Sequence, residues 1–229
     1  MRADGVLFDK DGTLFDFSAT WDVWAGGMIN HFAEGDPAVA GAIAQAVRYD
    51  LTERAFFPES PIIAGTNREA AEAVASALPG RDVDEIEIFL MRSSAEAPLA
   101  EAVPLAPFLE ALAGDGLALG VMTNDTEYGA RSHLQSAGVD GHFDFIAGFD
   151  SGYGAKPAPG PLLAFAEAME LTPERVVMVG DSTHDLIAGR AAGMQTVAVL
   201  TGVAGASELT PYADAVLPNI GHVPEWLRS

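Results

Sequence analysis

The fold is decided by residues 5–13, GVLFDKDGT. The apolar residues 6–8 predict a short buried strand, and the polar, glycine-containing turn that follows marks its end. Five further short apolar runs are bounded by glycine and polar residues; they lie at 117–122, 143–147, 176–179, 196–200 and 215–217. Helical patterns separate several of these runs, at 127–136, 160–169 and 184–192. This alternation predicts an α/β fold with a doubly wound, Rossmann-like parallel sheet as its core.

Residues 17–97 differ from the rest of the chain because they contain no convincing strand pattern. Apolar residues recur there at helical spacing in four stretches, which are 21–32, 37–49, 68–78 and 83–94. Pro58, Pro61 and Gly65 interrupt the pattern, so residues 55–67 are expected to form an irregular loop. We therefore predict an α/β core built from residues 1–16 and 98–229, with a helical insertion at 17–97.

The composition excludes several classes of protein. The chain has 229 residues, of which 49% are hydrophobic and 20% charged, and this balance is typical of a folded chain. Its formal charge of −21 repels nucleic acid and anionic lipid headgroups, so neither is an expected partner. There is no cysteine, and no apolar run has the length of a membrane span or of a signal peptide. We expect a cytoplasmic protein.

Two carboxylates, Asp9 and Asp11, follow the first predicted strand directly. Ligands bind at the carboxyl edge of an open parallel sheet, which is where both residues are expected to lie. A carboxylate can attack phosphorus and so divide one difficult step into two easier ones. This chemistry indicates Asp9 as a nucleophile and Asp11 as a general acid and base. Gly12 permits the sharp turn, and Thr13 is expected to stabilise it by a local hydrogen bond.

Two more carboxylates, Asp181 and Asp185, follow the strand predicted at 176–179. Their spacing of four residues places them on one side of a helix that begins near residue 182. An aspartate near a helix start is often only a capping residue. Together with Asp9 and Asp11, however, they form an oxygen-only cluster of the kind that Mg²⁺ prefers. The sequence therefore predicts a bound Mg²⁺ that offsets the repulsion among these four acids.

Two groups suited to a phosphate follow the other central strands. Thr123 and Asn124 come after the strand predicted at 117–122, where a hydroxyl and backbone amides meet a helix start. Lys156 follows the next strand, and Lys10 is the only other lysine of the chain. A strongly acidic protein needs a local positive charge to hold a phosphoryl group, and an ammonium provides one.

With these motifs in order, the sequence resembles the haloacid dehalogenase superfamily of phosphatases over essentially its whole length. Asp9, Asp11, Gly12 and Thr13 resemble the family's first motif and Thr123 its second. Lys156 resembles the third motif, and Gly180, Asp181 and Asp185 resemble the fourth. The insertion at 17–97 is similar to the family's α-helical cap.

The resemblance implies a role for each motif residue. Asp9 would form an aspartyl-phosphate, and Asp11 would protonate the leaving group and then activate water. Mg²⁺ would be held by Asp9, by the backbone carbonyl of Asp11 and by Asp181, with Asp185 in support. Thr123 and Lys156 would hold the phosphoryl oxygens. The implied activity is hydrolysis of a small phosphorylated metabolite, by a monomer or homodimer.

Other members of the family and one other class of protein remain alternatives. Asp11 argues against dehalogenation, because a halide leaves without a proton. The absence of lysine from residues 17–97 argues against the family's phosphonate hydrolases, which use a lysine there. A sugar-phosphate mutase resembling β-phosphoglucomutase shares the core motifs and stays open. A non-catalytic phospho-acceptor or binding protein is disfavoured, because Asp11 would hasten hydrolysis of the phosphorylated carboxylate.

The resemblance favours phosphoglycolate as the substrate. Its carboxylate calls for a cation in the helical insertion, where a guanidinium can bind both carboxylate oxygens. Arg54 and Arg68 flank the predicted loop at 55–67, and we therefore expect them, with Thr13 and Asn124, to contact the substrate.

Overall fold

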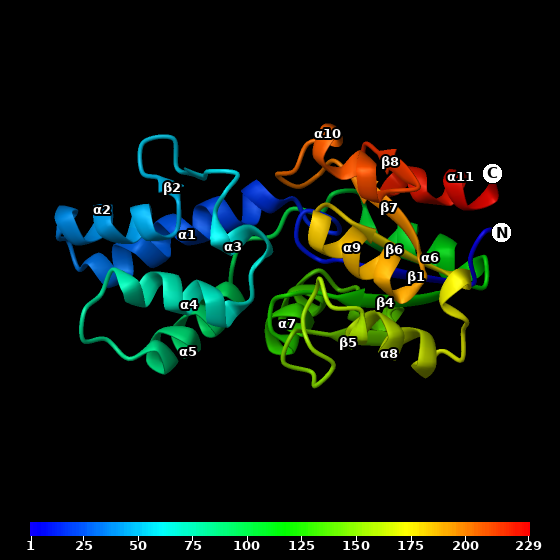
Figure 1. Cartoon of the computed structure of the whole chain (residues 1–229), viewed down its shortest axis with the longest axis horizontal. Coiled ribbons are helices and arrows are strands. Elements are labelled where there is room, and N and C mark those ends of the chain that lie inside the picture. The colour runs from blue at the N-terminus through cyan, green and yellow to red at the C-terminus, as the bar shows by residue number, and fades with distance from the viewer.

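The computed structural model describes residues 1–229. The chain folds into two lobes (Figure 1). One lobe contains the large sheet and the helices packed on it, and the other consists mainly of helices from the segment after β1. No helix combines the length and the apolar character needed to cross a bilayer.

All six strands of the large sheet are parallel and lie in the order β5-β4-β1-β6-β7-β8. Their bounds are β1 (Gly5–Phe8), β4 (Ala118–Met122), β5 (Phe145–Ala147), β6 (Val176–Gly180), β7 (Gln195–Val199) and β8 (Ala215–Leu217). Each begins and ends within two residues of a strand predicted from the sequence. The first strand lies at the centre, with β4 and β6 as its neighbours, so residues that follow these three strands share one edge of the sheet.

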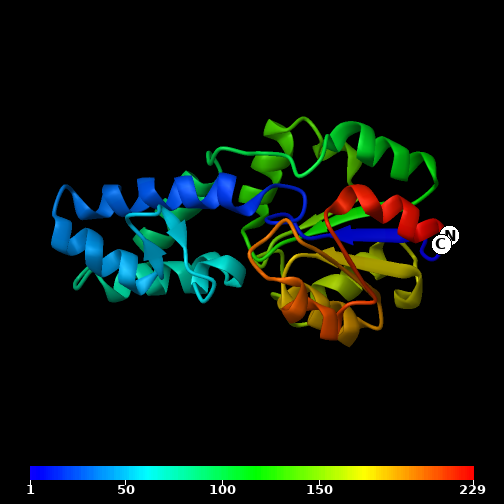
Figure 2. The same cartoon turned by 90° about the horizontal axis from the view of Figure 1, so that it is seen from above.

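Helices cover both faces of the sheet, as Figure 2 shows from above. Val6 and Phe8 of β1 face one layer and Leu7 faces the other, which is the alternation that a strand buried on both sides requires. The first layer contains α6 (Leu105–Gly114), α7 (Glu127–Ser136) and α11 (Val223–Arg228), and the second contains α8 (Gly160–Ala168) and α9 (Thr183–Ala192). The expected α/β class with a doubly wound sheet and an inserted helical cap is confirmed.

Shorter elements complete this lobe. They are α10 (Ala206–Leu209) and four 3₁₀ turns at Asp140–His142, Pro173–Arg175, Thr210–Tyr212 and Ile220–His222. The two chain ends lie together at the end of the lobe that is far from the helical lobe (Figures 1 and 2).

The helical lobe has a hydrophobic core of its own. Its sixteen buried apolar residues all lie between Phe17 and Leu90. The elements are α1 (Phe17–Ala33), α2 (Pro37–Ala46), β2 (Tyr49–Asp50), β3 (Ala55–Phe56), α3 (Pro61–Ala64), α4 (Asn67–Ser76) and α5 (Val83–Ser94). The four predicted helices correspond to α1, α2, α4 and α5.

Two expectations for the helical insertion are wrong: residues 17–97 contain the strands β2 and β3, and residues 55–67, expected to be irregular, contain β3 and α3. Strands β2 and β3 pair in an antiparallel hairpin, whose turn is held by backbone N–H groups of Thr52 and Glu53 that donate to the Asp50 carboxylate. Two-residue strands are too short to show an alternating pattern. Pro61 begins α3 at its first position, where proline is tolerated, so it starts a helix that the sequence interpretation placed in a loop.

Helix α6 was also missed from the sequence. None of the helices predicted from the sequence covers residues 105–114. Pro107 lies within the first turn of α6, where its missing N–H would have no partner in any case.

Candidate active site

The polar residues predicted at the sheet edge surround one cavity between the two lobes. Asp9, Thr123 and Asp181 follow β1, β4 and β6, and the parallel pairing of these strands brings the three residues together. The cavity encloses about 670 Å³, part of it open to solvent. Its floor is polar and comes from the sheet lobe, whereas its roof is largely apolar and comes from the helical lobe. The roof includes Phe17, Trp21, Trp24, Ile62 and Ile63.

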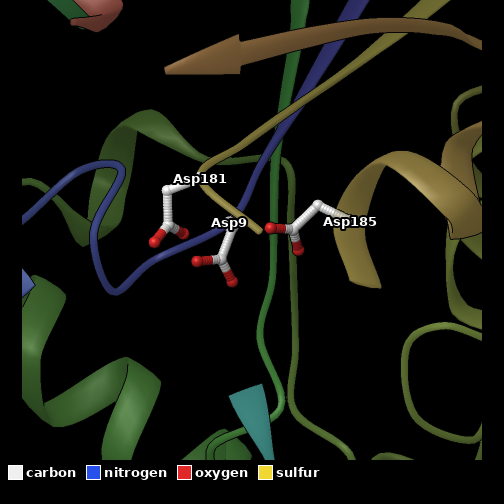
Figure 3. A group of neighbouring side chains, drawn as sticks. All are labelled: Asp9, Asp181 and Asp185. Atoms are coloured by element: carbon white, nitrogen blue, oxygen red, sulfur yellow. The ribbon is translucent and has the colours of Figure 1, made fainter. Parts of the chain in front are cut away.

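Three carboxylates meet on the floor of the cavity (Figure 3). Asp9, Asp181 and Asp185 are buried, and each places one oxygen within 4.8 Å of the others. An all-oxygen set with this spacing fits a hard divalent cation. Asp11 also lines the cavity, but its carboxylate is not part of this group. Four clustered acids were expected from the sequence, and the structure groups three of them without the Asp11 carboxylate. The backbone carbonyl of Asp11, which the family resemblance assigns to the metal, stays a prediction.

The positive charge near the three carboxylates is too small to balance their negative charge. Burial raises the pKa of Asp9 to about 7; Lys156 opposes this rise, and Asp185 and Asp11 add to it. Burial also raises the pKa of Asp181 well above its usual value, with further contributions from Asp9 and Asp185. Buried carboxylates that resist ionisation in this way favour a bound cation at the same place.

Lys156 supplies the one ammonium that contacts the cluster. Its Nζ donates to Asp9 Oδ1 at 2.5 Å, to Asp185 Oδ1 at 2.6 Å and to the Met122 carbonyl at 2.9 Å. Burial lowers the pKa of Lys156, but the two carboxylates raise it further, so the net shift is upward. The side chain is therefore charged and beside the proposed nucleophile, as a phosphoryl-binding group must be.

Asn124 fixes the loop that carries Lys156. Its Oδ1 accepts from the Lys156 backbone N–H, and its Nδ2 donates to the carbonyls of Lys156 and Ala64, each at 2.9 Å. Because Ala64 ends α3, this amide also connects the sheet lobe to the helical lobe. Asn124 lines the cavity as expected, with its amide already engaged by the protein.

Asp185 has a similar structural role in addition to its place in the cluster. Its Oδ2 accepts from the backbone N–H of Ser182 at 3.0 Å and from the Ser182 hydroxyl at 2.7 Å. Both oxygens thus have protein donors, since Lys156 contacts the other. This engagement suits the supporting role that the family resemblance implies for Asp185.

The turn after β1 depends on Gly12. Its φ of 74° lies in the left-handed region, and a Cβ at this position would overlap the Asp181 carboxylate. The expected local hydrogen bond of Thr13 is not formed: its Oγ1 is buried without a partner, and Thr13 does not line the cavity. Backbone bonds hold the turn instead, with Gly12 N–H donating to Phe15 O and Leu14 N–H to Lys10 O.

Thr123 lies on the cavity floor as predicted. It is 2% exposed, and its Oγ1 accepts from the Asp125 backbone N–H at 3.1 Å. Its hydroxyl proton stays available to a phosphoryl oxygen.

The structure does not bring the two predicted arginines to the cavity. Arg68 is half-exposed and contacts Glu72, Asp84 and Glu87, and it is absent from the lining. Arg54 ends the turn of the β2–β3 hairpin, also outside the lining. Acidic partners close in sequence and space hold Arg68 on the surface of α4, and the sequence pattern did not reveal this competition.

Sequence analysis also missed a group next to Asp11. Lys10 is fully buried and contacts Asp11, Asp125 and His133. The available signal was the rarity of lysine, because Lys10 and Lys156 are the only two lysines of the chain.

A family model of haloacid dehalogenase-like hydrolases matches residues 3–193. The chain belongs to the haloacid dehalogenase-like hydrolases. This match confirms the resemblance drawn from the four motifs. Among curated relatives, a phosphoglycolate phosphatase of Aquifex aeolicus is 30% identical over 86% of this chain and 84% of its own length. A phosphoglycolate phosphatase of Neisseria meningitidis is 40% identical over 48% of this chain, and the match spans only 47% of that relative.

Two further similarities extend over nearly the whole chain. The pyrophosphatase PpaX of Bacillus velezensis is 26% identical over 92% of this chain and 89% of its own length. The structure of CbbY from Rhodobacter sphaeroides, in complex with phosphate, has a TM-score of 0.72 at 20% identity and covers 96% of both chains. At that identity the structural likeness shows the shared fold alone. The names of the two phosphoglycolate phosphatases agree with the expected enzyme class, a phosphoric monoester hydrolase.

Proposed function

We propose that the protein is a Mg²⁺-dependent phosphatase that hydrolyses a small phosphorylated metabolite through a phosphorylated Asp9. The observation that carries the proposal is the position of Asp9 on the cavity floor, 2.5 Å from the Lys156 ammonium and within the three-carboxylate group. A nucleophile, a phosphoryl-binding cation and a set of metal ligands thus occupy one site.

The reaction divides into two displacements at phosphorus. In the first, an Asp9 oxygen bonds to phosphorus, the bond to the ester oxygen breaks, and Asp11 gives its proton to that oxygen. In the second, Asp11 takes a proton from water, the water oxygen bonds to phosphorus, and the bond to Asp9 breaks. Inorganic phosphate and a free alcohol are the products, and both aspartates return to their starting forms.

The chain offers residues for each remaining task. Lys156 and Thr123 would hold the phosphoryl oxygens, and Asp9, Asp181 and the Asp11 carbonyl would hold Mg²⁺, with Asp185 in support. When bound, the ion would neutralise charge on the phosphoryl group. The apolar roof would limit the access of water to the site during the first displacement, which favours transfer to Asp9 over side reactions.

We further propose residues 17–97 as the cap and phosphoglycolate as the first substrate to test. The cap assignment is supported by the apolar roof that this segment contributes to the cavity. The choice of phosphoglycolate is supported by the names of relatives from Aquifex and Neisseria. A cytoplasmic location and a monomeric or dimeric state stay predictions from the sequence.

The test is a screen of the purified protein with Mg²⁺ against phosphoglycolate, pyrophosphate and β-glucose 1-phosphate, with the Asp9→Asn variant as control. We expect release of inorganic phosphate by the wild type and none by the variant. Conversion of the sugar phosphate to an isomer would indicate a mutase instead. Phosphate release by Asp9→Asn at the wild-type rate would refute the assignment of Asp9.

A further inference from the structure

A fully buried lysine next to the catalytic turn has no role in the reaction described so far. Lys10 lies between Asp9 and Asp11 in sequence, and the ion pairs of its Nζ are with Asp11 and Asp125. Its Nζ lies 2.9 Å from Asp11 Oδ1 and 2.8 Å from Asp11 Oδ2. One ammonium therefore contacts both oxygens of the carboxylate that must give and take the proton.

The surroundings of Lys10 keep its ammonium charged and in place. Burial lowers the pKa of Lys10, but Asp11 and Asp125 raise it more, so the net shift is upward. Asp125 Oδ2 lies 3.1 Å from Nζ, and the ring of Trp21 lies 5.4 Å from it in a cation–π contact. A long flexible side chain is thereby confined to one position.

His133 completes the set of contacts from the side of α7. Its Nδ1 lies 2.9 Å from Lys10 Nζ and its Nε2 lies 2.7 Å from the Ser94 carbonyl. Because an ammonium only donates, Nδ1 must accept, and Nε2–H then donates to Ser94. Burial lowers the pKa of His133 and Lys10 lowers it further, in agreement with this neutral form.

These contacts join Asp11 to both ends of the helical insertion. Trp21 belongs to α1, which begins the insertion, and Ser94 is the last residue of α5, which ends it. We propose that Lys10 is a positioning residue that holds the Asp11 carboxylate in the orientation required for proton transfer, and that Trp21 and His133 fix Lys10 for this purpose. This inference rests on the proposed function, because it assigns a partner to its acid and base.

A positioning role predicts a loss that depends on the leaving group. An alkyl phosphate needs a proton from Asp11 when its alkoxide leaves, whereas p-nitrophenyl phosphate releases a stable phenolate without one. For the aryl ester, kcat/KM reports only the transfer of the phosphoryl group to Asp9. Asp11 is then needed only for hydrolysis of the phosphorylated Asp9. Misplacing Asp11 should therefore lower kcat/KM for the alkyl ester and spare it for the aryl ester.

The experiment compares Lys10→Met with the wild type on an alkyl and an aryl phosphate. We expect kcat/KM to fall about 100-fold for the alkyl ester, within the range that general acid catalysis contributes. For p-nitrophenyl phosphate we expect a change of less than about threefold, followed by a burst of p-nitrophenolate and slow turnover. An equal loss on both esters would overturn the proposal, because a general structural defect does not distinguish leaving groups.

Two further variants isolate the connection to Asp11. In an Asp11→Asn background, Lys10→Met should cause no further loss on the alkyl ester, since the group it positions is already gone. A full additional 100-fold loss there would overturn the proposal. Arg175→Met is the matched control: it removes a cation that contacts Asp4, at the opposite end of β1, and should leave both kcat/KM values unchanged.

A last variant keeps the test valid if Lys10→Met does not fold. Lys10→Met with Asp125→Asn removes one buried acid together with the cation, so the charge of the group is unchanged. The double variant should show the same loss of kcat/KM on the alkyl ester and none on the aryl ester. A ratio of the two kcat/KM values equal to that of the wild type would refute the proposal. The aryl ester also separates the two claims, because failure of the wild type to hydrolyse it would refute the proposed function itself.

Discussion

We expect Asp9 to make the stability of the metal-free protein fall as pH rises. Its pKa is raised from 3.8 to about 7 by burial in the folded protein. Between these values the folded protein keeps a proton that the unfolded chain has released, so a rise in pH favours unfolding. The stabilising contribution is complete below pH 3.8 and is lost as pH passes through about 7.

The size of this effect follows from the two pKa values. At about 1.4 kcal/mol per pH unit, the full range corresponds to about 4 kcal/mol. The interval from pH 5 to pH 7 corresponds to about 2 kcal/mol, because Asp9 is already half ionised at pH 7. Asp181, whose pKa is also raised by burial and by Asp9, acts in the same direction, whereas Asp4 and Glu127, whose pKa values are lowered, act in the opposite direction at lower pH. The contribution of Asp9 must therefore be measured as a difference.

The assay is urea unfolding in the presence of a chelator at several pH values between 5 and 7, for the wild type and Asp9→Asn. We expect the free energy of unfolding of the wild type to fall relative to the variant by about 2 kcal/mol over this interval. Equal pH dependence of the two proteins would refute the account of the buried charge. Added Mg²⁺ should stabilise the wild type more at pH 7 than at pH 5, because the ion binds the ionised carboxylate.

Three other substitutions test individual parts of the site. Gly12→Ala should abolish activity and destabilise the fold by about 1–3 kcal/mol more than Gly35→Ala, which has a similar left-handed φ but open space around it; equal losses would remove the clash with Asp181 from the argument. Lys156→Met should lower kcat by about 100-fold or more, and near-normal turnover would show that another group holds the phosphoryl oxygens. Arg68→Ala should change the KM for phosphoglycolate by less than about twofold, whereas a tenfold increase would restore the sequence-based assignment of Arg68 to the substrate.

Much of the sheet lobe was predictable because its signals are local. The central strands are short apolar runs with both faces buried, and they are followed by polar turns, as at Asp9 and Asp181. Parallel pairing then places those turns at one edge, so the positions of the motif residues follow from the order of the strands. This rule alone predicts the position of the residues at the sheet edge, which are Asp9, Thr123, Lys156, Asp181 and Asp185.

The parts that were not predictable depend on competition among neighbours in space. Thr13 has a hydroxyl that could bond locally, but backbone bonds stabilise its turn and leave the hydroxyl without a partner. Arg68 could bind a substrate carboxylate, yet three acids of α4 and α5 already contact it. Lys10 contacts His133, which is 123 residues away in the sequence. No spacing rule connects such pairs.

The most direct test of the central claim is to trap the phosphorylated enzyme. Asp11→Asn should slow hydrolysis of the intermediate, so this variant is mixed with p-nitrophenyl phosphate and Mg²⁺, quenched in acid and analysed by peptide mapping. We expect the phosphoryl group on the peptide that contains residue 9. The double variant that carries both Asp11→Asn and Asp9→Asn should show no phosphorylated peptide. A phosphoryl group on any other residue, or turnover of the wild type by direct attack of water without labelling, would contradict the assignment of Asp9 as the nucleophile.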